Sequence, residues 1–144
     1  MSVADVAAVD AAVIATLAAD ATLTALLPDG VYLDLAPSNK TRFVIVQHQT
    51  HEDVEAFGGT AHYETFRYRV TARVLESTGV NANTAAARIH ALLHGQTLTP
   101  IAGYTHMATI RVERVKFPEV DAIDNDIRWQ IAGGDYDVFV SPTT

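Results

Sequence analysis

The chain has 144 residues, of which 49% are hydrophobic, and this suits a single folded domain covering 1–144. Its formal net charge of −7 disfavours a protein that grips nucleic acid through the phosphates alone. There is no cysteine, which excludes disulfide frameworks, thiolate nucleophiles and cysteine-based zinc sites.

The first predicted element is a helix near the N-terminus, where apolar residues recur every three or four positions: Val6, Val9, Val13, Ile14 and Leu17. The segment has no basic region in front of it and carries acids, so it makes a poor signal peptide. No stretch of the chain approaches the ~18 uninterrupted apolar residues of a membrane span. Asp20 is predicted to cap a second short helix, which the "PDG" turn at 28–30 ends.

Two strands and a loop are predicted next. The segment 31–35 suits a short strand, and 42–49 suits a strand that is apolar on both faces and therefore covered on both for part of its length. The acidic, glycine-rich stretch 50–61 has no clear period. We expect it to be a long mobile loop with its tip near Gly58 and Gly59.

The clearest predicted strand covers 62–77. Alternate residues from Phe66 onward are apolar and point one way, while Arg67, Arg69 and Arg73 point the other way. This strand is about three times as long as the usual strand of ~5–6 residues.

A helix and a further strand follow. Asn83 is predicted to cap the helix, which runs to about His94 and stops at Gly95. Another long strand is predicted at 105–117, where Arg111 alternates with apolar residues. The polar stretch 118–126 is predicted as a loop.

The closing segment "WQIAGGDYDVFV" at 129–140 raises a question about Gly133 and Gly134. The pair suits the two-residue turn of a hairpin, or a bulge within one long strand. One strand from Ile127 to Val140 would match the length of its predecessor, and a bulge would account for the change of apolar phase between Ile131 and Tyr136. Length and phase favour the bulge over the hairpin.

These elements predict an α+β fold. We expect two layers, with a mainly antiparallel sheet of about five strands and helices packed on one face. The other face would carry the arginine row, and Arg111 is expected to lie on the same face as Arg67, Arg69 and Arg73.

Histidines and acids offer two weak candidates for chemistry. His90 and His94 have a helical spacing that can chelate a metal, but a structural role at the helix end is favoured. His48, His51 and His62 can meet across a hairpin beside Glu52 and Asp53, in an adventitious metal site or a solvated loop. Asp135 with Asp137, and Asp124 with Asp126, are weak signs of hydrolysis. With no nucleotide or nucleophile motif present, we expect no enzyme, cofactor or metal.

The arginine row has two interpretations. It can be an ordinary solvated face, or a partner surface whose guanidinium groups pair with carboxylates. A chain with a basic row and an acidic surplus can pair its row with the acidic patch of a neighbour, which favours ring-forming contacts. On this hypothesis, charge reversal at Arg69 and Arg73 weakens assembly without unfolding the monomer.

The order of these segments resembles the tail terminator (tail completion) proteins of long-tailed bacteriophages. The resemblance rests on five stretches of sequence: "LAADATLTALLPDGVYLDLAP" (17–37), "RFVIVQH", "YETFRYRVTARVLE", "NTAAARIHALLHG" and "RWQIAGGDYDVFV". It implies a virion protein, assembled in the host cytoplasm, that forms a ring on the head-proximal end of the tail. The ring is usually a hexamer that stops growth of the tail tube and offers a docking surface to the neck or head-completion proteins. It implies no catalytic residue, cofactor or membrane contact, and DNA only in transit through the channel.

Neighbour contacts are expected from the arginine row and from acidic loops. The candidate interface residues are Arg67, Arg69, Arg73, Arg111, Glu52, Asp53, Glu55, Gly58, Gly59, Glu119, Asp121 and Asp124. The nearest alternative function is a head–tail connector (neck) subunit or a minor tail-tube subunit. A small metal-dependent hydrolase and a non-viral binding module are more distant alternatives.

Overall fold

The structure is a computed structural model that describes residues 6–55, 62–98, 100–120 and 128–143. The helices are α1 (Val6–Ala18), α2 (Ala21–Leu26) and α3 (Val80–Leu93), and the strands are β1 (Val31–Leu33), β2 (Arg42–Glu55), β3 (His62–Leu75), β4 (Tyr104–Val120) and β5 (Arg128–Pro142). Among these described residues, no helix combines the length and apolar character needed to span a membrane.

The strands form one five-stranded sheet in the order β1-β2-β3-β5-β4. Every neighbouring pair is antiparallel except β1 and β2, which are parallel and matched over three residues. The expectation that consecutive strands pair antiparallel is therefore wrong for this pair. The predicted α+β class with a mainly antiparallel sheet is confirmed.

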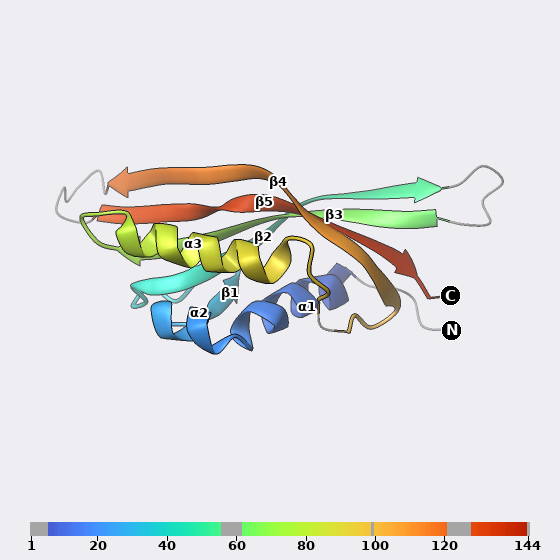
Figure 1. The fold of residues 1–144 in the computed structure, drawn as a ribbon, viewed down its shortest axis with the longest axis horizontal. Coiled ribbons are helices and arrows are strands. Elements are labelled where there is room, and N and C mark those ends of the chain that lie inside the picture. The colour runs from blue at the N-terminus through green and yellow to red at the C-terminus, as the bar shows by residue number, and fades with distance from the viewer. Residues whose placement is uncertain (1–5, 56–61, 99, 121–127, 144) are drawn as a thin grey trace.

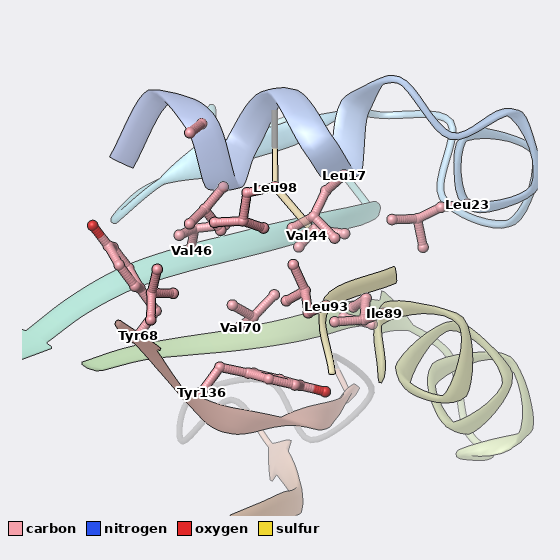
Figure 2. Packing of buried hydrophobic residues seen from close by; sticks show 14 of the residues in the cluster. Leu17, Leu23, Val44, Val46, Tyr68, Val70, Ile89, Leu93, Leu98 and Tyr136 are labelled. Atoms are coloured by element: carbon pink, nitrogen blue, oxygen red, sulfur yellow. The ribbon is translucent and has the colours of Figure 1, made fainter. Parts of the chain in front are cut away.

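The helices cover one face of the sheet, as predicted, and leave the other face without a helical layer (Figure 1). The core lies between the helices and the central strands, where Leu17, Val44, Val70 and Ile89 are fully buried (Figure 2). The buried apolar side chains of β3 are the even-numbered ones that the alternation of that strand predicted, and among the described residues of the strand Thr71 is the one odd-numbered residue that is also buried. Burial of this apolar surface, at roughly 25 cal/mol per Å² removed from water, supplies the main driving force for the fold.

The β2–β3 hairpin is longer than predicted. We expected a loop from Thr50 onward, but β2 continues to Glu55 with a register shift between His48 and Thr50. Cross-strand pairing with β3 therefore overrides the lack of an apolar period. The two strands extend beyond the helical layer (Figure 1), and we call this end, Thr50–Glu55 with His62–Arg67, the β2–β3 arm. Gly58 and Gly59 lie outside the described residues.

Helix ends test three of the predicted signals. Asp20 caps α2 as predicted, because its Oδ2 accepts a hydrogen bond of 2.8 Å from the Leu23 N–H. Asn83 is wrong as a cap, since α3 begins at Val80 and the N-cap position is Gly79. Gly95 follows α3 with φ +70°, the left-handed backbone that terminates helices at glycine, so this stop signal is confirmed.

The Asp20 carboxylate also makes two hydrogen bonds with Arg88, at 2.6 and 2.9 Å. These bonds, with that from Leu23, lower the pKa of Asp20 from 3.8 to about 2 against the opposing effect of burial. A carboxyl group with a lowered pKa in the folded state stabilises the fold above its unfolded pKa and loses that effect as the pH falls through the folded value.

We therefore predict that Asp20→Asn lowers the free energy of unfolding by about 1 kcal/mol at pH 7. The difference from wild type should shrink as the pH falls from 3.8 towards about 2. Urea unfolding across this pH range measures it. Asp34→Asn, which removes the same charge at an exposed acid, is the control. A gap between Asp20→Asn and wild type that stays constant with pH would contradict the assignment.

The closing strand β5 is continuous through Gly133 and Gly134, which excludes the hairpin. The predicted bulge there is also wrong, because both glycines keep an unbroken register with β3 and with β4. The register shifts fall in β4 instead, at Met107 and Val112. The glycines serve a close approach of backbones: a Cβ on Gly133 would lie 1.9 Å from the carbonyl oxygen of Val70.

Without a bulge in β5, its apolar residues divide between the two faces. Tyr136 belongs to the main core, whereas Ile131 is opposite Arg73 on the face without helices. There Ile131 is 2% exposed, and Phe43 and Ile45 on the same face are 7% and 2% exposed. This small second cluster accounts for the change of apolar phase that suggested a bulge.

Candidate interaction surfaces

The arginine row lies on the face without helices, and two of its members are already paired within the chain. The Arg67 guanidinium binds the Asp137 carboxylate at 2.8 and 3.1 Å, and Arg69 binds Asp135 at 2.9 and 3.2 Å. The register explains this, because Arg67 and Arg69 stand directly opposite these acids. Such two-point contacts are the strongest geometry for an arginine and a carboxylate.

The hydrogen bonds to Asp137 and Asp135 raise the pKa of Arg67 and of Arg69, respectively. Asp135 is almost buried, with 8% of its side chain exposed, and the Arg69 guanidinium is its ion-pair partner at this depth. The two ion pairs therefore join β3 to β5 within the sheet. Whether the exposed edges of these guanidinium groups also contact a neighbour stays a prediction.

The other two arginines of the predicted row lie apart. Arg73 lines a hollow of about 230 Å³ together with Leu35, Pro37 and Glu119, and burial lowers its pKa. Arg111 lies on the opposite face, because it is opposite Tyr136 and lines a groove against α3. The expectation that Arg111 shares a face with the row is therefore wrong, and the earlier register shift at Met107 is the cause, because without it Arg111 would be opposite Asp135.

Some of the acidic residues predicted to contact a neighbour lie in strands, and the others lie outside the described residues. Glu52 and Asp53 are exposed on the β2–β3 arm, and the backbone of Glu55 ends β2. Glu119 is exposed near the end of β4, so it belongs to a strand and not to the predicted loop. Asp121 and Asp124 lie outside the described residues.

Among the described residues, only His51 and Asp53 of the predicted set of histidines and acids meet in a candidate metal cluster on the arm, and its third member, Glu64, was not in that set. His51, Asp53 and Glu64 place one ligand atom each within 4.8 Å of one another. His51 Nε2 lies 2.7 Å from Glu64 Oε1, which also accepts a hydrogen bond of 3.3 Å from the Tyr104 hydroxyl. These groups satisfy one another, so the contacts account for the nearly buried Glu64 without an ion.

His90 and His94 have structural partners. Their rings stack with centroids 4.7 Å apart, and His94 Nδ1 accepts a hydrogen bond of 3.0 Å from the Arg111 N–H. That bond ties the end of α3 to the edge of β4 and uses one of the two nitrogens of His94. The favoured structural interpretation of this pair fits the contacts.

The sequence analysis missed a basic groove between α3 and β4. It has a volume of about 370 Å³, and its polar lining includes Asn83, His90, Arg111, Arg114 and Lys116. Simple alternation would put Arg111 and Lys116 on opposite faces of a strand. The register shift at Val112 brings them together, opposite Tyr136 and Ala132 of the helix-covered face.

The outer edge of β4 is the second feature that the sequence did not reveal. Large exposed hydrophobic residues gather on this strand more than elsewhere in the described chain: Met107, Ile110, Val112, Phe117 and Val120. β4 is an edge strand, and beyond Arg111 its outer main-chain groups meet no other described strand. An exposed apolar edge of this length is typical of a surface that another chain covers.

Together these features define a class: a small α+β structural subunit with an extended sheet, internally paired charges and an open edge. The family model described as "Tail completion protein gp17" matches residues 11–122, which is more than half of the chain. The chain therefore belongs to the tail completion protein family. It is a structural protein of the phage tail.

Comparison with solved structures agrees in fold. The chain is similar to a chain in the structure entitled "Virion of native gene transfer agent (GTA) particle", with a TM-score of 0.71. The sequences are 20% identical, and the match covers 97% of this chain and 99% of the other. A search of curated proteins found no match.

Proposed function

We propose that this chain caps the phage tail tube as a ring, with six copies as the expected number. The ring ends polymerisation of the tube and offers a docking surface to the neck or head-completion proteins, and DNA passes through its centre. The observation that carries the proposal is the family match over residues 11–122.

The shape and charge of the subunit are consistent with this role. The long strands give a rigid frame, and the side without helices is a broad sheet surface (Figure 1). The net charge of −7 per copy makes any ring strongly negative overall. A negative ring lets DNA slide past, because a surface with few cations binds few DNA phosphates and gains little from counterion release.

The test is loss and replacement of the gene in the phage. Without the protein, tails should polymerise beyond their normal length and fail to join heads, and a plasmid copy should restore joined particles. An affinity label on the protein should mark the head-proximal end of the tail in electron micrographs.

The alternative is a neck connector or a minor tail-tube subunit, and the same label separates these functions. A label repeated along the tube, or one held on heads that lack tails, would contradict the terminator function. Joined particles with normal tails in the absence of the protein would contradict all of these assembly functions.

A further inference from the structure

The basic groove carries a charge that the described chain does not neutralise. Arg111, Arg114 and Lys116 line it, and none of them forms an ion pair with an acid among the described residues. The acid within this run, Glu113, is opposite Asp135 and so points to the other face of the sheet. The groove therefore presents concentrated positive charge on a chain that is negative overall.

The positive charge of the groove affects the pKa of its histidine, His90. Burial, Arg111, His94 and Arg114 all lower the pKa of His90 from 6.5. The buried Tyr136 hydroxyl lies 3.5 Å from His90 Nδ1, and burial raises the pKa of that tyrosine. Near pH 7 the groove thus combines a neutral imidazole with its cations, a lining suited to carboxylates.

The complementary surface lies on the same chain. Between residues 43 and 66 there is no lysine or arginine, but β2 carries three acids, Glu52, Asp53 and Glu55, besides the nearly buried Glu64. The Asp53 side chain is 61% exposed, and Glu52 is also exposed. The β2–β3 arm that carries them and the C-terminal end of β4 lie at opposite ends of the molecule (Figure 1), and the groove residues Arg114 and Lys116 belong to the C-terminal half of β4. One copy therefore cannot satisfy its own groove with its own arm.

Both surfaces also have unpaired strand edges. β1 covers the outer edge of β2 only at Val44–Val46, so the edge from Gln47 to Glu55 meets no other described strand. The β4 edge beyond Arg111 is open on the opposite side of the sheet. Opposite charge and open edges at opposite ends are what a head-to-tail contact between identical chains requires.

We propose that the acidic β2–β3 arm of one copy docks against the basic α3–β4 groove of the next copy. The inference rests on the proposed ring and names its subunit contact. A second copy is favoured over a tube or neck protein because both halves of the contact are present on this chain, with matching opposite charge. Contact with a different protein is an outcome that the test distinguishes.

The absence of cysteine allows a direct test by cross-linking. Asp53→Cys combined with Lys116→Cys, in phage particles treated with a short bismaleimide, should give a ladder of covalent multimers of this chain on a denaturing gel. Each single variant should give no ladder. A double variant that supports particle formation without a ladder, or that links only to another protein, would overturn the proposal.

Charge reversal gives an independent readout. Lys116→Glu should weaken self-association by about tenfold, and adding Asp53→Lys to it should restore most of the loss by exchanging the two charges. Lys40→Glu makes the same change in net charge outside the groove and should have little effect. Sedimentation of the purified chains and phage titre on complementation measure these outcomes.

The two proposals fail in different ways. If Lys116→Glu assembles like wild type, or if Asp53→Lys does not rescue it, the arm–groove contact is wrong. The proposed function is unaffected by those results, because it depends on the position of the label in the particle. A label that is absent from the tail end contradicts the function whatever the cross-links show.

Discussion

Replacing Gly133 with alanine is expected to lower the free energy of unfolding by roughly 3 kcal/mol or more, or to prevent folding. An added Cβ would lie 1.9 Å from the Val70 carbonyl oxygen and 2.8 Å from the Thr71 Cα. Both obstacles are backbone atoms of the central strand β3, which is held by hydrogen-bonded neighbours on each side. Relief of the clash would therefore have to separate β3 from β5.

Gly79→Ala is the matched control, because a Cβ there would meet the Gln130 Oε1 at an ordinary distance of 3.4 Å. Its φ of −89° is also accessible to alanine. Urea unfolding followed by circular dichroism compares the two variants. If Gly133→Ala were as stable as Gly79→Ala, the close approach of β3 and β5 would be wrong.

This glycine shows where the sequence was informative and where it was not. Strand length correctly predicted one continuous β5 in place of a hairpin. The change of apolar phase suggested a bulge, but the apolar residues around Ile131 bury a second cluster on the other face. A single sequence cannot show that both faces are partly covered, since this depends on where a distant segment such as Leu35–Pro37 lies.

The surfaces were harder to predict than the fold, for a similar reason. The even-numbered core of β3 followed from simple alternation. The basic groove did not, because the register shift at Val112 moves Arg114 and Lys116 onto the face of Arg111. Nothing in the local sequence marks that extra residue. Pairing of the strand with β5 determines where it falls.

The pairing of the arginine row also depends on strand order. Arg67 and Arg69 have the same spacing as Asp135 and Asp137, which would allow cross-strand pairs. β4 comes between β3 and β5 in the chain, yet β5 is the neighbour of β3 in the sheet. That arrangement pairs Arg67 and Arg69 with acids of the same chain, and it changes what a mutation there should do.

We predict that Arg69→Glu destabilises the monomer by roughly 3 kcal/mol, contrary to the initial expectation that reversal here spares the fold. The substitution removes two hydrogen bonds from Asp135 and places a like charge beside a carboxylate that is only 8% exposed. Glu113 adds further negative charge nearby. The charges of Glu113 and Asp135 both raise the pKa of Arg69, so both would repel a glutamate at that position. Urea unfolding of the purified chain measures the loss.

Asp135→Arg added to Arg69→Glu should recover much of that stability, because the exchanged pair restores opposite charges across β3 and β5. Arg114→Glu is the matched control: the same reversal on an exposed β4 residue should change the free energy of unfolding by no more than about 0.5 kcal/mol. If Arg69→Glu left stability unchanged, the internal ion pair would contribute little and the row would again be available to a partner. If it unfolds the chain while Arg114→Glu impairs only assembly, the row holds the sheet together and the groove binds the neighbour.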